Sequence, residues 1–254
     1  MAATIDLNAD LGEGFGKSRL GEDEALLELV SSANIACGFH AGDATTMSDT
    51  VRAAKHRGVV IGAHPSYPDL PGFGRRELGL SPAEISFHVE AQVRALAAVC
   101  VAQEARLSYV KPHGALYNRA AKDADAAKAI AVAISKVDPG LTLLGLAGSG
   151  MAAAAANNGL RFASEAFIDR AYAPDSTLVP RGETGAVIED VDEAVERALT
   201  MARDHSIRAI TGETLRVEAD SLCVHGDNPE AATLLRAVRA KLQAEGFAIE
   251  PFAK

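Results

Sequence analysis

The chain has 254 residues, 48% of them hydrophobic and 23% charged, a composition typical of a folded protein of one or two domains. Its formal net charge is −9 and its lysines and arginines form no basic run, which excludes binding to nucleic acid or to an anionic membrane. The opening residues lack the pattern of a signal peptide, and we find no apolar run long enough to span a bilayer.

Short apolar runs of strand length alternate with segments of helical pattern along the chain, an order typical of parallel βα units. No composition break divides them, so we expect residues 1–254 to form a single domain. Either a closed or nearly closed βα barrel or an open, doubly wound sheet fits this order. The predicted strands cover residues 4–10, 32–39, 59–65, 107–113, 141–148, 161–167 and 221–227.

Helices are predicted between these strands over residues 81–99, 190–205 and 227–246. The first has the clearest start, because Ser81 is a good N-cap and Glu84 completes a capping box. The longest irregular stretch covers residues 172–189. Loops of this length are more often functional than accidental, so we expect a lid or a binding loop there.

The first strand runs into "NADLGEGFGKS", whose last letters look like a phosphate-binding loop. Such a loop has a glycine six residues before the lysine, so that its backbone N–H groups surround the phosphates. Counting back from Lys17 reaches Leu11, and Gly12 is one residue too late. We therefore expect no nucleotide-binding loop, and another role for this acidic, glycine-rich turn.

Four of the seven histidines share a local pattern: an apolar run, the histidine, and a turn rich in Gly, Pro and Asp. The carboxyl ends of parallel strands meet at one face, where active sites form, so we expect the polar residues at these ends to share one cleft. They are Asn8, Asp10 and Glu13 after the first strand, His40 and Asp43, His64, Lys111 and His113, Glu165, Asp169 and Arg170, and His225 and Asp227.

Lys111 lies in a strand beside Tyr109 and Val110, where a structural lysine would be poorly solvated. We therefore expect a functional cation that faces a solvated cleft. Arg75, on a glycine-rich loop, is a candidate for closing over a carboxylate or phosphate, although exposed arginines are also common.

Two kinds of chemistry fit this set, and the residues leave both open. One is a divalent metal ion held by Asp10 with His40, His64 or His113, which would activate a water molecule. The other is metal-free acid–base catalysis, with Asp10 or a histidine as the base and with Lys111 and Arg170 holding an anionic substrate. The candidate catalytic residues are Asp10, His40, His64, Lys111, His113 and Glu165. The candidate substrate-binding residues are Asn8, Glu13, Asp43, Arg75, Asp169, Arg170, His225 and Asp227.

The three cysteines, Cys37, Cys100 and Cys223, are far apart and lie in apolar stretches. An odd number of separated cysteines favours buried free thiols over a disulfide framework, and hence a reducing cytoplasm.

The segments "DLNADLGEGFG", "SSANIACGFHAGD", "VVIGAHPSYPDLPGFGRR", "YVKPHGALYN", "EAFIDRAY" and "VHGDNP" resemble, in order and spacing, the LamB/YcsF family over essentially the whole chain. The resemblance implies a seven-stranded βα barrel akin to metal-dependent polysaccharide deacetylases. It also implies ATP-dependent opening of 5-oxo-L-proline to L-glutamate by a 5-oxoprolinase, in which this chain acts with two other subunits, B and C, and ATP is a co-substrate.

Two alternatives remain beside that activity. By analogy with the deacetylases, the chain is a stand-alone, metal-dependent hydrolase of N-acyl sugars. Alternatively, it is a non-catalytic subunit that binds the substrate or regulates its partners.

Overall fold

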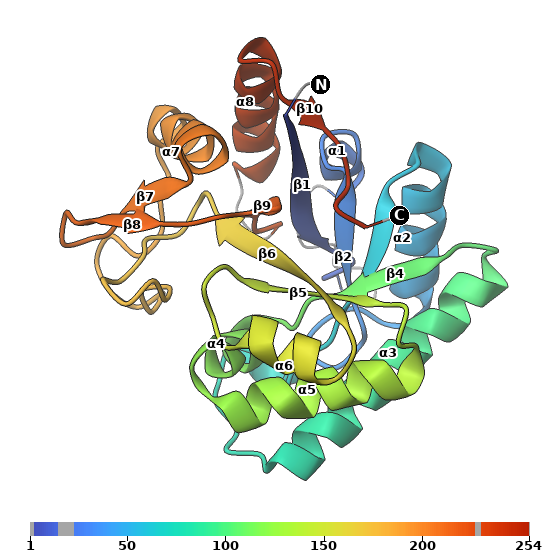
Figure 1. Ribbon diagram of the computed structural model, residues 1–254. Coiled ribbons are helices and arrows are strands. Elements are labelled where there is room, and N and C mark those ends of the chain that lie inside the picture. The colour runs from blue at the N-terminus through green and yellow to red at the C-terminus, as the bar shows by residue number, and fades with distance from the viewer. Residues whose placement is uncertain (1–2, 15–22, 227–229, 254) are drawn as a thin grey trace.

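The central feature of the computed structural model, which describes residues 3–14, 23–226 and 230–253, is a closed barrel of seven parallel strands (Figure 1). Each strand pairs with the next, and the last pairs with the first, so the closed barrel is confirmed and the open sheet is excluded. The strands are β1 (Thr4–Leu11), β2 (Ser32–Ala36), β3 (Val60–His64), β4 (Leu107–Val110), β5 (Thr142–Leu146), β6 (Arg161–Phe167) and β9 (Ser221–Val224).

All seven predicted strands are present, and three short strands are additional. β10 (Ala248–Ile249) adds to the amino-terminal half of β1. β7 (Ser206–Arg208) and β8 (Thr214–Arg216) form an antiparallel pair that lies to one side of the barrel in Figure 1. β5 and β9 are nearly continuous apolar runs, as expected for strands buried on both faces, whereas β1 carries the buried polar residues Asp6, Asn8 and Asp10.

Helices cover the outside of the barrel (Figure 1). They are α1 (Asp23–Leu27), α2 (Ala44–Arg57), a 3-10 turn η1 (Leu70–Gly72), α3 (Pro82–Ala102), α4 (Gly114–Lys122), α5 (Ala124–Val137), α6 (Met151–Asn157), α7 (Val191–Asp204) and α8 (Ala231–Ala244). The capping box at Ser81 and Glu84 is present at the start of α3. The predicted start of the last helix, at residues 227–229, and the "GKS" letters of the first turn lie outside the described residues.

The helix α3 is long and apolar enough, by length and composition alone, to cross a membrane, which we did not expect from the sequence. In the structure it packs on α5, β3 and β4 and buries Ile85, Val89, Val93 and Leu96 against them. It is therefore placed as one of the outer helices of the barrel, and this packing accounts for its buried apolar residues, whereas Phe87 and Val101 are exposed.

The segment of residues 172–189 is held against the rest of the protein at both ends. At one end the carbonyl oxygen of Tyr172 accepts a hydrogen bond from the N–H of Ile210 at 2.8 Å, and at the other Val187 forms an isolated bridge with Arg170. The guanidinium of Arg170 donates hydrogen bonds to the carbonyl oxygens of Val179 and Ala186, at 2.5 and 3.2 Å. These contacts tie the backbone of the segment to the strand end after β6.

Candidate active site at the carboxyl end of the barrel

Part of the set of polar residues predicted to follow the strands lines one cleft of 210 Å3, namely Asp10, His64, Lys111, His113, Arg170 and His225. Asp10 comes from the end of β1, His64 from the end of β3, and Lys111 directly follows β4. The loop of residues 172–189 forms another wall, as expected for a binding loop. The cleft is lined by Asp10, His64, Arg75, Lys111, His113, Tyr117, Phe167, Arg170, Arg181 and His225, among others.

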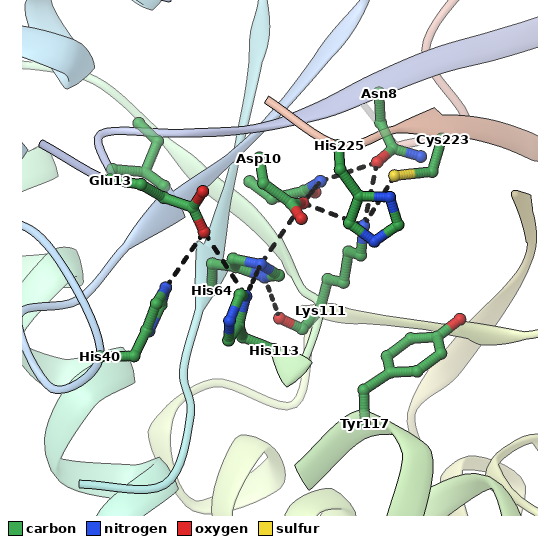
Figure 2. A network of polar contacts seen from close by, with 12 residues as sticks. Asn8, Asp10, Glu13, His40, His64, Lys111, His113, Tyr117, Cys223 and His225 are labelled. Atoms are coloured by element: carbon green, nitrogen blue, oxygen red, sulfur yellow. Dashed lines mark hydrogen bonds and ion pairs between the residues drawn. The ribbon is translucent and has the colours of Figure 1, made fainter. Parts of the chain in front are cut away.

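Lys111 lies at the centre of this arrangement, near Asp10, Asn8 and Cys223 in Figure 2, and its ammonium group lies between two carboxylates. Its Nζ is 3.0 Å from Oδ1 of Asp10 and 2.8 Å from Oε1 of Glu165, and it also donates to Oδ1 of Asn8 at 3.3 Å. The Cys223 thiol lies 3.1 Å away. Lys111 borders the cleft, but its side chain is only 2% exposed. The expectation of an ammonium facing solvent is therefore wrong, because two buried acids enclose it.

The charges of this group stabilise one another. Burial raises the pKa of Asp10, but the charges of His64 and Lys111 outweigh it and hold that pKa well below its usual range. Burial lowers the pKa of Lys111, but Asp10 and Glu165 outweigh it and hold that pKa well above its usual range. Asp10 and Lys111 are therefore both charged at neutral pH. A carboxylate and an ammonium side by side can accept a proton and stabilise a developing negative charge.

Three histidine rings lie beside this pair (Figure 2). The rings of His40 and His113 are stacked, with centroids 3.9 Å apart, and His64 meets both edge to face. Burial and neighbouring histidines lower the pKa of His40 and of His113 well below the usual range, so both are neutral at neutral pH.

Glu13 completes this cluster. One ligand atom from each of Glu13, His40, His64 and His113 lies within 4.8 Å of all the others, so the four could hold a metal ion. From the sequence we expected Asp10 to be the carboxylate ligand of the metal ion and Glu13 to bind the substrate. Asp10 is instead adjacent to the cluster, with Oδ1 3.3 Å from Nε2 of His64.

The close packing of this cluster requires a glycine at position 74. Gly74 has φ +64°, in the left-handed region, and a Cβ there would lie 2.9 Å from the side chains of His40, Ser66 and His113. Its carbonyl accepts a hydrogen bond from the N–H of Ala115 at 2.9 Å. The β3–α3 loop is thus folded directly against the start of α4, which brings Arg75 to the cleft.

A second acid–histidine pair lies across the cleft. The Asp169 carboxylate contacts Nδ1 of His225 at 3.0 Å and accepts a hydrogen bond from its backbone N–H at 3.1 Å. The ring of His225 stacks on Phe167 at 5.2 Å. These contacts fix the ring of His225, which lines the cleft. Asp169 does not line the cleft itself and is connected to it through His225.

Other predicted residues lie outside the cleft lining or have structural partners. Asn8 is buried beneath the site, where its amide donates to Ser221 at 2.7 Å. Asp43 is the N-cap of α2 and accepts from the N–H of Thr46 at 2.8 Å. Arg170 borders the cleft, although its guanidinium holds the loop of residues 172–189. Asp227 lies outside the described residues.

Several lining residues were not predicted, among them Tyr117 and Arg181. Tyr117 lies in the first turns of α4, just after the N-cap residue His113, and donates from its hydroxyl to Oε2 of Glu165 at 2.8 Å. Arg181 reaches the cleft from the loop of residues 172–189. That loop was expected to bind, but nothing in the sequence distinguishes this arginine from an exposed one.

Comparisons with known proteins agree with this fold. The model of the LamB/YcsF family matches residues 5–254. The chain is 52% identical to the A subunit of the 5-oxoprolinase of Paracidovorax citrulli, over 98% of this chain and 99% of that protein. It is similar to a solved lactam utilization protein from Thermus thermophilus, with a TM-score of 0.92 and 45% identity over 98% of this chain and 100% of that one.

A more distant likeness concerns the fold alone. The structure titled T48 deacetylase with substrate has a TM-score of 0.50 and 14% identity, covering 98% of this chain and 87% of that one. The family model and the relatives of about half identity, in contrast, extend over nearly the whole chain. The chain therefore belongs to the LamB/YcsF family.

Proposed function

We propose that this chain is the A subunit of a cytoplasmic, ATP-dependent 5-oxoprolinase, which acts with subunits B and C to open 5-oxo-L-proline to L-glutamate. The observation that carries the proposal is the 52% identity, over 98% of the chain, to relatives named as the A subunit of 5-oxoprolinase. The small cleft, with a buried lysine between carboxylates and with arginines at its wall, suits a small anionic substrate.

The reaction explains why ATP is required. A five-membered lactam closes readily because its amine and carboxyl groups are tethered neighbours, so plain hydrolysis is poorly driven. Transfer of the γ-phosphoryl group of ATP to the lactam oxygen releases ADP and makes the ring carbon an electrophile. Water adds to that carbon, the ring C–N bond breaks, and the nitrogen accepts a proton. A second water then hydrolyses the acyl phosphate to carboxylate and phosphate.

The described residues have natural roles in the two hydrolytic steps. Asp10 is ionised and can accept a proton from the attacking water. The ammonium of Lys111, 3.0 Å from Asp10, would stabilise the negative charge that develops on the substrate oxygen. His225, oriented by Asp169, is placed to give a proton to the leaving nitrogen.

Anionic parts of the substrate would meet the arginines. Arg75 and Arg181 line the cleft from two different loops, and a guanidinium binds a carboxylate or phosphate through two parallel hydrogen bonds. The sequence has no complete phosphate-binding loop, so we assign the activation of the substrate by ATP to subunits B and C.

The test is ATP-coupled glutamate release by this chain alone and together with B and C. We expect turnover only when all three are present. Asp10→Asn should reduce turnover of the complex by about 10²-fold or more without preventing assembly, which size-exclusion chromatography checks. ATP-dependent glutamate formation by the single chain would contradict the division of labour. Full turnover with Asp10→Asn would make this chain a non-catalytic binding subunit.

A stand-alone hydrolase of N-acyl sugars remains the second candidate, because Glu13 and three histidines form a group that could hold a metal. It predicts release of acetate from N-acetylated sugars without ATP and without partners. The same preparation of the purified chain, assayed for acetate, separates the two functions.

A further inference from the structure

Two histidine nitrogens face each other at the bottom of the cleft. Nε2 of His64 lies 2.9 Å from Nδ1 of His113. The second nitrogen of each ring contacts a backbone carbonyl oxygen: Nδ1 of His64 is 2.8 Å from the oxygen of Lys111, and Nε2 of His113 is 2.9 Å from the oxygen of Phe73. A carbonyl can only accept a hydrogen bond, so these nitrogens must carry the ring protons.

This assignment leaves two lone pairs directed at one another. A neutral imidazole has one N–H and one lone pair, and both N–H groups are already used by the carbonyls. Two facing lone pairs at 2.9 Å repel, so a cation must lie between them: either a proton on one of the two nitrogens or a metal ion that takes the place of that proton. A ring that donates its other N–H to a backbone carbonyl is also the usual arrangement of a metal-binding histidine, because the carbonyl fixes the tautomer and the orientation.

Glu13 and His40 supply the remaining donors at matching distances. Oε1 of Glu13 lies 3.3 Å from Nε2 of His40 and 3.5 Å from Nδ1 of His113. Two nitrogen or oxygen ligands at 2.0–2.1 Å from one tetrahedral ion are ~3.3 Å apart. The measured separations of 2.9, 3.3 and 3.5 Å lie on either side of this value. All pairs of ligand atoms in the group lie within 4.8 Å, so an ion that binds all four residues would draw the more distant pairs closer together.

Asp10 is held away from this position by its own partners. Its Oδ1 accepts from the ammonium of Lys111 at 3.0 Å and from the amide of Asn34 at 2.9 Å. A carboxylate oxygen that already binds a buried ammonium is a poor ligand for a second cation. Asp10 therefore borders the cluster through His64 instead of completing it.

We propose that Glu13, His40, His64 and His113 form a binding site for one divalent transition-metal ion, with Glu13 as its carboxylate ligand and Asp10 outside the coordination sphere. Three imidazoles and one carboxylate suit Zn²⁺ or Co²⁺, whereas Mg²⁺ prefers six oxygen ligands. The site does not depend on the proposed reaction, because an ion could bind there whichever substrate the cleft accepts.

The experiment measures metal binding directly. The full-length chain is freed of metal with a chelator and titrated with CoCl2, followed by its visible absorption, and with ZnCl2 by calorimetry. We expect one ion per chain, the visible bands of four-coordinate Co²⁺, and no comparable binding of Mg²⁺. Glu13→Gln should weaken binding by about 100-fold or more, because loss of a partner of a ligand already costs 10–100-fold.

Two variants make the comparison specific. Asp10→Asn should change the affinity by less than about 10-fold, and Glu104→Gln, which alters an acid that is 91% exposed just after α3, should leave it unchanged. Circular dichroism of each metal-free variant checks folding, and His40→Gln replaces Glu13→Gln if that variant does not fold. Absence of stoichiometric Co²⁺ and Zn²⁺ binding by the wild-type chain would overturn the proposal. So would a greater loss of affinity with Asp10→Asn than with Glu13→Gln or His40→Gln.

Discussion

Replacing Lys111 with methionine tests the central electrostatic feature of the site. The ammonium is buried between Asp10 and Glu165, which are 4% and 0% exposed. Methionine has a similar length but no charge, so Lys111→Met leaves two buried carboxylates without their cation. Removing one partner of a buried ion pair costs about 3–5 kcal/mol. For a chain of this size, that corresponds to a decrease in Tm of about 6–20 °C.

The pH dependence gives this prediction a signature that a packing defect would not produce. In the native protein the pKa of Asp10 is held low, so its contribution to stability is present at neutral pH and is lost as the pH falls. In Lys111→Met the stranded carboxylates should have raised pKa values in the folded state. Protonation of these carboxylates at low pH makes the variant's loss of stability smaller, and that loss of stability grows as the pH rises through their pKa values. We therefore expect a larger decrease in Tm at pH 8 than at pH 5.

Thermal unfolding at both pH values is measured beside Lys136→Met, a matched control. Lys136 is 57% exposed and lies 3.8 Å from Glu90, so its replacement should cost at most about 1 kcal/mol at either pH. Glutamate release by the complex of Lys111→Met with B and C should also fall by about 10²-fold or more. A Tm within experimental error of the native value at both pH values would refute the account of Lys111 as the buried partner of two acids.

Three further predictions concern residues around this centre. Burial raises the pKa of Asp6 to about 6, from a usual value of 3.8, so its contribution to stability is complete below that usual value and is lost as the pH rises past 6. Asp6→Asn should thus raise the free energy of unfolding at pH 8 by at most ~3 kcal/mol, with little or no gain at pH 4. Urea unfolding measures this change, and a lower free energy of unfolding at pH 8 would contradict the prediction. In Asp169→Asn the amide still fits beside His225 but no longer stabilises the charged form of that histidine. The variant should lower kcat of the complex by about 10-fold or more with little change in KM. An unchanged kcat would show that His225 takes no part in catalysis. Gly74→Ala should lower the free energy of unfolding, measured by thermal unfolding, by about 1–3 kcal/mol and should weaken Co²⁺ binding. The reason is that the left-handed φ and the new Cβ both disturb His113. A stable variant with native Co²⁺ affinity would show that the loop adapts.

The sequence by itself determined the positions of the seven barrel strands along the chain and the strand ends at which the site lies. Each strand is mainly apolar, and polar residues gather at or just after the strand ends, so the pattern is local and can be read along the chain. Parallel strands bring their carboxyl ends to one face, and this rule was enough to place Asp10, His64 and His113 together.

The partners of each side chain were decided only by the tertiary structure. Lys111 and Asp10 are 101 residues apart, and their contact depends on the register of two strands and on the closure of the barrel between β1 and β9. The sequence does not show that Asp10 pairs with Lys111 whereas Glu13 contacts the histidines, because both acids lie at the end of the same strand. Closure and register are global properties that no local pattern encodes, and they determined which carboxylate does which task.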